Sequence, residues 1–303
     1  MVKITVDFGP KQGAITREAI EQMLGLKPRR MKLSTEWKDA LHKPDSDEKD
    51  WSIVLPFCET FRGAFTSCSV RSIGMQVSQK GGRCYTFLKI DGDEKDALDE
   101  VRAWLKSIGQ HVAIRDCLAL SFAIDYDRVD GNPAKPQTPV GKLRTVAKTY
   151  GAKPTKETMS AADKLVDKCV GFLGEVTCYN SMDAIVAMPP SDPKKVFDLP
   201  SHLAAGIAKA LQKSDLSQAV KTLKARPPLK DTAVGKKLKA LEGTIQVDPK
   251  PVKGKVILLV DDLYQSGVAL NYVGMLLLEA GATKVFGLAC EKTCRNDDNV
   301  SGG

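Results

Sequence analysis

Between residues 116 and 290 the sequence alternates apolar segments of strand length with segments of helix length. The strand-like segments lie at 116–127, 182–190, 256–260 and 284–290, and the helix-like segments lie at 142–151, 160–174, 199–212 and 269–281. Apolar strands separated by helices are typical of a parallel sheet that is covered by helices on both faces. The sequence therefore predicts an α/β domain of this type over residues 113–303.

Residues 1–112 show a different pattern. Segments 2–8, 51–58 and 83–90 read as strands, whereas 16–25, with Thr16 as N-cap, and 96–109 read as helices. We expect a small α+β unit here. It is a candidate hood over a ligand, or a surface for a protein or nucleic-acid partner.

The composition is that of a soluble globular protein, because 43% of the 303 residues are hydrophobic and 27% are charged. No apolar run approaches the roughly 20 residues of a membrane helix, and the first residues lack the apolar core of a signal peptide. These features predict a cytoplasmic protein that does not enter a membrane. The eight cysteines are scattered and only three histidines accompany them, which favours reduced thiols over a zinc site.

One stretch, VILLVDDLYQSGVAL, combines an apolar run with two acids and a glycine. Asp261 and Asp262 follow the apolar residues 256–260 and are expected to begin a loop over residues 261–267, which leads into a helix. Ligands bind at the carboxyl ends of parallel strands, and a helix N-terminus suits a phosphate. Gly267 permits close backbone approach, and the acids suit hydroxyls or a divalent cation shared with the ligand. The alternative is that these acids cap a helix in an unrelated α/β domain.

The stretch resembles the phosphoribosyl-pyrophosphate motif of type I phosphoribosyltransferases, and within that group the competence-protein-F-like (amidophosphoribosyltransferase-like) branch. The upstream stretches ALSFAIDYD, TPVGKLRTVAKTYG, DAIVAMPPS and ARPPLKDTAVGKKLKALEGTIQV extend the resemblance over residues 115–295. It implies binding of phosphoribosyl pyrophosphate or a nucleotide, with Mg²⁺ held by the two acids indirectly, through ligand and water. The implied ligand-binding residues are Asp261, Asp262, Leu263, Tyr264, Gln265, Ser266, Gly267, Val268 and Ala269.

A basic segment precedes the motif: residues 221–255 contain ten Lys and Arg but three acids. The resemblance places residues 226–242 where the family has a flexible loop that closes over pyrophosphate, and it makes Lys230, Lys237 and Arg226 the catalytic cations. It also assigns a second pyrophosphate contact to Ser191, Lys194 and Lys195. A solvated face and a nucleic-acid patch remain alternatives for the basic segment. It contains no aromatic residue, which disfavours stacking on single strands.

The sequence departs from the family at two positions. Gln265 and Ala269 stand where the family usually has hydroxyl residues, so phosphate binding is expected to be weakened but not lost. Purine salvage members have a carboxylate at the position of Gln265, and an amide cannot act as a general base. We therefore expect a Mg²⁺-dependent phosphoribosyltransferase-like protein that is not a hypoxanthine or guanine salvage enzyme, and a homo-oligomer is compatible with this.

Two other functions remain open at this stage. The first is a catalytically weak regulatory module that binds a nucleotide. The second is a nucleic-acid-linked protein of DNA uptake or phage defence. The acceptor of the phosphoribosyl group does not follow from the sequence.

Overall fold

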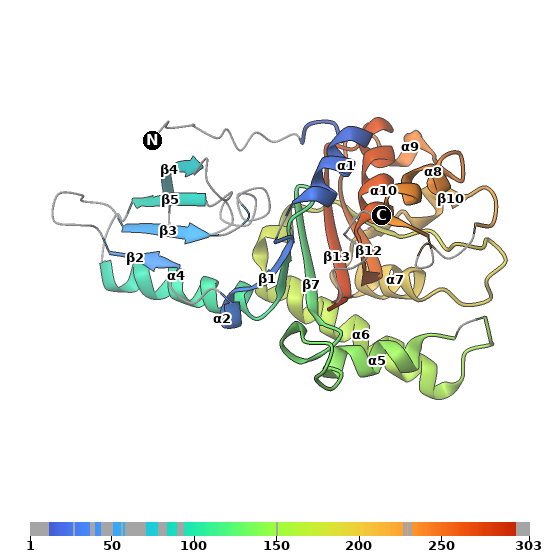
Figure 1. Ribbon diagram of the computed structural model, residues 1–303, viewed down its shortest axis with the longest axis horizontal. Helices are drawn as coiled ribbons and strands as arrows, with labels where there is room; N and C mark the ends of the chain where they lie inside the picture. The colour runs from blue at the N-terminus through green and yellow to red at the C-terminus, as the bar shows by residue number, and fades with distance from the viewer. Residues whose placement is uncertain are drawn as a thin grey trace.

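A computed structural model describes residues 12–26, 28–36, 40–43, 51–55, 57, 71–77, 84–89, 94–149, 151–226, 229 and 232–294. The strand expected at 2–8, and Lys230 of the basic segment, lie outside these residues. The chain contains a larger α/β body and a smaller sheet beside it (Figure 1).

A seven-stranded sheet forms the centre of the α/β body, in the order β1-β6-β7-β13-β12-β8-β9. The last five of these strands run parallel, whereas β1 and β6 are antiparallel to their neighbours. The bounds are β1 Arg30–Lys32, β6 Val112–Ile114, β7 Leu120–Tyr126, β8 Ala184–Ala187, β9 Ser214–Asp215, β12 Val256–Tyr264 and β13 Lys284–Lys292. A separate ribbon pairs β10 (Val220–Thr222) with β11 (Ile245–Val247).

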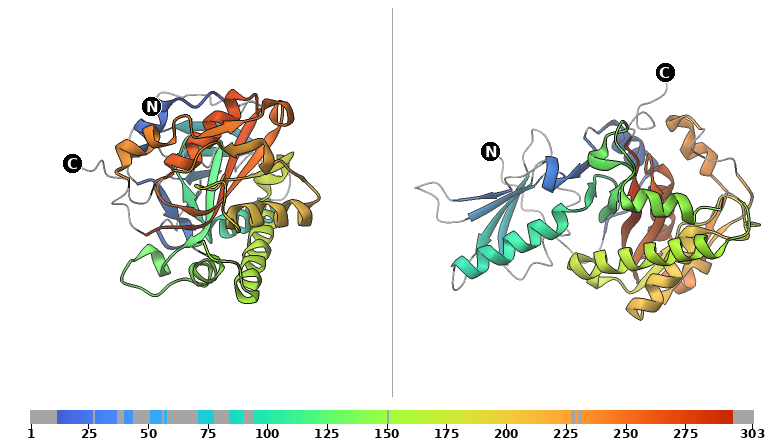
Figure 2. Two further views of the ribbon diagram at one scale, coloured as in Figure 1. Left: turned by 90° about the vertical axis from the view of Figure 1, so that its right-hand side faces the viewer. Right: turned by 90° about the horizontal axis from the view of Figure 1, so that it is seen from below.

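Helices cover both faces of this sheet (Figure 2). One face packs against α5 (Pro139–Ala147), α6 (Lys156–Glu175) and α7 (Leu199–Leu211), and the other carries α1 (Arg17–Gly25), α8 (Val234–Leu241), α9 (Pro249–Val252) and α10 (Val268–Glu279). Successive side chains of a strand point to opposite faces. Leu258 and Val260 of β12 accordingly enter one core, and Ile257 and Leu259 enter the other. The predicted α/β class, with helices on both faces of a mostly parallel sheet, is confirmed.

The smaller sheet is antiparallel, in the order β2-β3-β5-β4. Its strands are β2 Leu41–His42, β3 Trp51–Leu55, β4 Arg71–Val77 and β5 Cys84–Lys89, and the helices near it are α2 (Leu33–Glu36) and α4 (Glu94–Gly109). The preceding residues join the larger sheet, since β1 pairs with β6 and α1 packs on α10. Thr16 caps α1 as predicted, because its side chain accepts a hydrogen bond from Ala19 N. The division of the chain near residue 112 stays a prediction.

The structure corrects the predicted end of β12. The sequence placed Asp261 and Asp262 in a loop after an apolar strand, but β12 continues to Tyr264. Its last residues pair with β13, with Asp261 opposite Ala289 and Leu263 opposite Glu291. The strand continues past the apolar run because β13 offers a backbone partner for the acidic residues too. The loop before α10 is therefore shorter than expected, at residues 265–267.

Cys117, Cys169, Cys178, Cys290 and Cys294 are free thiols, and all of these except Cys117 are buried. Cys169 and Cys290 have their sulfur atoms 3.9 Å apart in the core. No group of His, Cys, Asp and Glu within the described residues is arranged to hold a metal ion by itself. Among those residues there is also no helix with the length and hydrophobicity needed to span a bilayer.

Candidate ligand site

A cleft of about 470 Å³ opens at the carboxyl ends of β8 and β12. Four parts of the chain line it: the end of β12 with the loop 265–267, the loop 188–200 after β8, residues 144–149 at the end of α5, and the basic segment through Arg226, Leu229 and Lys237. The strand order explains this convergence. Because β8 and β12 are parallel neighbours, the loops that follow them begin at the same edge of the sheet.

Asp261 and Asp262 have different surroundings although they are adjacent. Asp262 is 6% exposed and its Oδ2 accepts hydrogen bonds from Lys148 Nζ at 2.7 Å and Arg144 Nε at 2.8 Å. Asp261 is partly exposed, lines the cleft and forms no ion pair within the described residues. Its Oδ1 accepts the backbone N–H of Asp262. Asp261 is thus the carboxylate of the pair that has room for a ligand.

The ionisation of the two acids follows from these contacts. Burial raises the pKa of Asp262, but Arg144 and Lys148 outweigh it and hold that pKa at about 2. Burial raises the pKa of Asp261 well above its usual value, and the charge of Asp262 adds to this. A cation or a hydrogen-bond donor from a ligand would favour the ionised form of Asp261.

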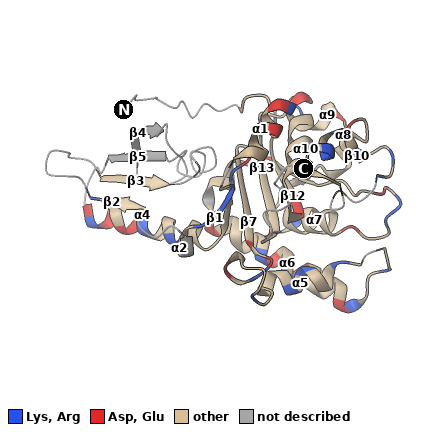
Figure 3. Ribbon diagram, in the orientation of Figure 1, with Lys and Arg blue, Asp and Glu red and all other residues tan. Residues whose placement is uncertain are grey.

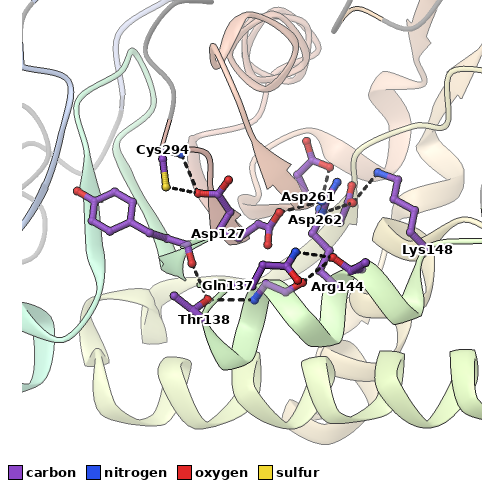
Figure 4. Close-up of polar contacts among 12 residues, drawn as sticks. Asp127, Gln137, Thr138, Arg144, Lys148, Asp261, Asp262 and Cys294 are labelled. Carbon is purple, nitrogen blue, oxygen red and sulfur yellow. Dashed lines mark hydrogen bonds and ion pairs between the residues drawn. The ribbon is translucent and has the colours of Figure 1, made fainter. Parts of the chain in front are cut away.

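Figure 4 shows Arg144 and Lys148 beside Asp262. Arg144 also connects Asp262 to a third carboxylate. Its Nη1 donates to Oε1 of Glu291, on β13, at 2.8 Å. The Glu291 side chain is 4% exposed, and its Oε2 has no hydrogen-bond partner among the described residues. Burial raises the pKa of Glu291 to about 7, although Arg144 opposes the shift. Arg144 of α5 and Lys148 directly after it therefore anchor Asp262, and Arg144 also binds Glu291.

The loop 265–267 is built for a close backbone approach. Gly267 has a φ angle of +81°, a backbone conformation that residues with a Cβ rarely adopt. A Cβ at this position would also collide with the ring of Tyr264. Gly267 is the N-cap of α10, whose first turn points its free N–H groups toward this end of the helix. The glycine is thus required by the fold as well as being suited to an anion.

Behind the loop lies a buried polar cluster. The Tyr264 hydroxyl donates to Asp116 Oδ2 at 3.0 Å, and Asp116 also accepts from Ser121 Oγ at 3.0 Å. Asn271 Nδ2 donates to Gly267 O at 2.9 Å. Burial raises the pKa of Asp116, and the hydrogen bonds it accepts oppose that rise. The cluster fixes Tyr264 and Gly267 in place from the core side.

Three predicted cations line the cleft. Lys195 lies after β8 with Nζ 3.6 Å from Asp198 Oδ1. Arg226 donates its backbone N–H to Ser191 O at 3.0 Å, and its buried Nε has no hydrogen-bond partner among the described residues. Lys237 is 2% exposed, with Nζ 3.4 Å from Ser266 Oγ. Lys237 belongs to helix α8, so this part of the segment that was expected to be a loop is helical and already lies against the loop 265–267.

The structure brings most of the predicted site residues together. Those that line the cleft are Asp261, Asp262, Leu263, Tyr264, Gln265, Ser266, Gly267, Ala269, Ser191, Lys195, Arg226 and Lys237. Val268 is fully buried in the core, and Lys194 is exposed and does not line the cleft. Lys230 lies outside the described residues.

Sequence reasoning missed the contribution of α5 and β13. Arg144 and Lys148 belong to an ordinary amphipathic pattern, and their spacing of four residues, which places them on one helix face, was the available signal. Glu291 was hidden because the strand was expected to end at Cys290, whereas β13 continues to Lys292. The apolar and aromatic lining of Met188, Phe197 and Leu199 was likewise not predicted.

No protein-family model and no curated protein matches this chain. The solved structures that are similar to it include two that each have 13% sequence identity over 92% of this chain. The first is the glutamine phosphoribosylpyrophosphate amidotransferase from B. subtilis complexed with ADP and GMP, with a TM-score of 0.33 over 56% of that chain. The second is described as the allosteric regulatory enzyme of purine biosynthesis, with a TM-score of 0.34 over 55% of that chain. This chain thus spans little more than half the length of either, and the interpretation of the cleft rests on its own geometry.

Proposed function

We propose that this chain is a phosphoribosyltransferase-like protein that binds phosphoribosyl pyrophosphate or a nucleotide in the cleft. One observation carries the proposal: the acid pair, the loop 265–267 and cations from two other segments all line the same cleft. A ligand with vicinal hydroxyls and two separate phosphate groups matches this set of groups.

Each part of the cleft has a partner on such a ligand. The 5-phosphate would lie at the loop 265–267, where Ser266 and the first turn of α10 supply hydrogen-bond donors. The ribose hydroxyls would contact Asp261. Pyrophosphate would lie between the loop after β8, with Ser191 and Lys195, and Arg226 of the basic segment, since these residues line the remaining wall.

The same groups would assist a transfer reaction. When the bond from the anomeric carbon to pyrophosphate breaks, positive charge develops on the ribose and negative charge on the leaving group. Lys195 and Arg226 would stabilise the leaving group, and Asp261 would lie near the developing positive charge. The buried Nε of Arg226 without a described partner supports a role for this side chain toward an added anion.

The residues present fit a Mg²⁺ ion that is held mainly by the ligand. Mg²⁺ keeps several waters and commonly binds through one or two carboxylates and substrate phosphates. The described residues offer no complete metal cage, and Oδ2 of Asp262 is already bound by two cations. Asp261 would therefore be the main protein contact to such an ion, which would neutralise charge on the pyrophosphate.

A second function, a catalytically weak regulatory module, is favoured by a specific observation. Arg144 and Lys148 bind Asp262, so one of the two acids is engaged in the fold, and Gln265 and Ala269 lack the family hydroxyls. Assignment to the competence-protein-F-like branch, to the cytoplasm and to DNA uptake or phage defence stays a proposal that rests on the sequence alone.

Calorimetry with phosphoribosyl pyrophosphate, with and without Mg²⁺, tests the proposal. Micromolar to millimolar binding that depends on Asp261 supports it, and pyrophosphate release in the presence of candidate acceptors then identifies the enzyme. Binding without release selects the regulatory module. No binding at low salt, with DNA retained, would reject the proposal in favour of a nucleic-acid role.

A further inference from the structure

A buried arginine from outside the predicted α/β domain contacts the loop 265–267. Arg29 is 5% exposed, and its Nη2 donates a hydrogen bond to Ser266 O at 3.0 Å. It directly precedes β1, and its own carbonyl accepts the N–H of Arg115, so the backbone around it is fixed to the larger sheet. Arg29 is not among the residues that line the cleft, and it therefore supports the loop from behind.

The contact determines which way the loop peptides face. Arg29 binds the carbonyl oxygen of Ser266, and Asn271 binds that of Gly267, both from the core side. In a planar trans peptide group the C=O and the following N–H point in opposite directions. The N–H groups of Gly267 and Val268 are consequently directed away from Arg29 and Asn271, and Gly267 itself lines the cleft.

The charge of Arg29 strengthens the same arrangement. A carbonyl that accepts a hydrogen bond from a charged group is polarised, and the N–H of the same peptide group becomes a better donor. Lys237 Nζ lies 3.4 Å from Ser266 Oγ, so the loop has a cation on each of two sides. Both features favour an anion at the loop.

We propose that Arg29 is a positioning residue that orients and polarises the loop 265–267 for the 5-phosphate of the ligand. This inference rests on the proposed function, and it gives residues before the α/β domain a direct role in the site. It predicts an effect on ligands that carry a 5-phosphate. It predicts no effect on inorganic pyrophosphate, which would bind at Ser191, Lys195 and Arg226.

The test compares two ligands and two matched variants by calorimetry. In Arg29→Met, affinity for ribose 5-phosphate is expected to fall about tenfold or more, in line with loss of one charge-assisted hydrogen bond. The affinity of Arg29→Met for pyrophosphate with Mg²⁺ should stay within about twofold of the wild-type value. A general loss of structure would instead lower the affinity for both ligands. Arg30→Met is the control, because Arg30 Nη2 also donates to a backbone carbonyl, that of Cys294 at 2.9 Å, but does not contact the loop.

The outcomes separate the two proposals. Unchanged ribose 5-phosphate affinity in Arg29→Met, or an equal fall for both ligands, overturns the role of Arg29 and leaves the proposed function standing. Absence of binding of both ligands to the wild-type chain overturns both proposals. If Arg29→Met does not fold, Arg29→Lys provides the test, because it keeps the charge but loses the planar donor geometry. Its affinity for ribose 5-phosphate should fall several-fold. Unchanged affinity overturns the inference.

Discussion

Asp261 and Asp262 occupy different surroundings, so replacing each one should have a different result. Asp262→Asn should lower the free energy of unfolding by about 3 kcal/mol, because it leaves Arg144 and Lys148 without their shared buried carboxylate. Asp261→Asn should not lower stability, because burial already disfavours the charged form of Asp261, and it should weaken phosphoribosyl pyrophosphate binding by about 1–3 kcal/mol. Urea denaturation and calorimetry on both variants measure this. Equal effects of the two variants on affinity would contradict the separate roles.

Glu291 should make stability depend on pH near neutrality. Its pKa is raised from 4.5 to about 7 by burial, so the folded state binds more protons than the unfolded state between these values. Stability from this group is therefore present below pH 4.5 and is lost as the pH rises through 7, by up to about 3 kcal/mol. Glu291→Gln keeps an acceptor for Arg144 and should remove this loss.

Urea unfolding at pH 5 and pH 8 provides the measurement. The wild type should lose stability between these two values, and Glu291→Gln should lose less. Asp262 acts in the opposite sense, because its pKa is lowered to about 2. Its contribution is present above pH 4 and is lost as the pH falls toward 2, outside the tested window. A pH response that is identical in the two proteins would exclude Glu291 as its source.

At the scale of elements, α10 and the loop before it define the predicted phosphate site. Ala269 lies in the first turn of α10 and lines the cleft. Ala269→Thr adds the hydroxyl that the family usually has there, and it should tighten ribose 5-phosphate binding by roughly 1 kcal/mol, the value of one ordinary hydrogen bond. Ala269→Val is the matched control, because it adds similar bulk without the hydroxyl. A gain in both variants, or in neither, would mean that the loop does not bind this phosphate.

Elements were predictable where one physical signal dominated. The apolar runs of β8 and β12 identified those strands, because burial on both faces determines their composition. The amphipathic pattern of α6 identified that helix, because one of its faces is buried. Strand ends were not predictable in this way. Asp261, Asp262 and Glu291 are acidic, yet they continue β12 and β13, because the backbone pairing between the two strands extends to Tyr264 and Lys292. Arg144 also forms ion pairs with Asp262 and Glu291.

The same limit applies to the site. The residues at 261–269 were found from one continuous stretch, because strand, loop and helix follow each other directly. Arg144 and Glu291 are 147 residues apart in sequence and meet only through tertiary structure. Arg29 lies 237 residues before its partner Ser266. No local pattern contains such contacts, and the order of strands in the sheet was needed to place them.

At the scale of the whole molecule, the basic segment presents lysines to two different environments. Lys237 of α8 is buried beside the cleft, whereas its helix neighbours Lys236 and Lys239 are exposed. Figure 3 shows further Lys and Arg in the loops at this end of the molecule. A site that binds a small ligand and a surface that binds nucleic acid would therefore use different lysines of the same helix.

Substituting these lysines separates the proposed functions. Lys237→Met should weaken binding of ribose 5-phosphate by about tenfold, because the ammonium group of Lys237 lies beside Ser266, and it should leave DNA binding unchanged.

If the exposed face of α8 binds DNA, the double variant Lys236→Ala with Lys239→Ala should weaken that binding and make its salt dependence shallower by up to about two charges. If that face is only solvated, the double variant should change stability by less than about 0.5 kcal/mol and affect neither ligand. Calorimetry with ribose 5-phosphate and DNA titrations at several salt concentrations measure both quantities. Loss of DNA affinity in the double variant, with no effect of Lys237→Met on the phosphate ligand, would replace the phosphoribosyl proposal with a nucleic-acid function.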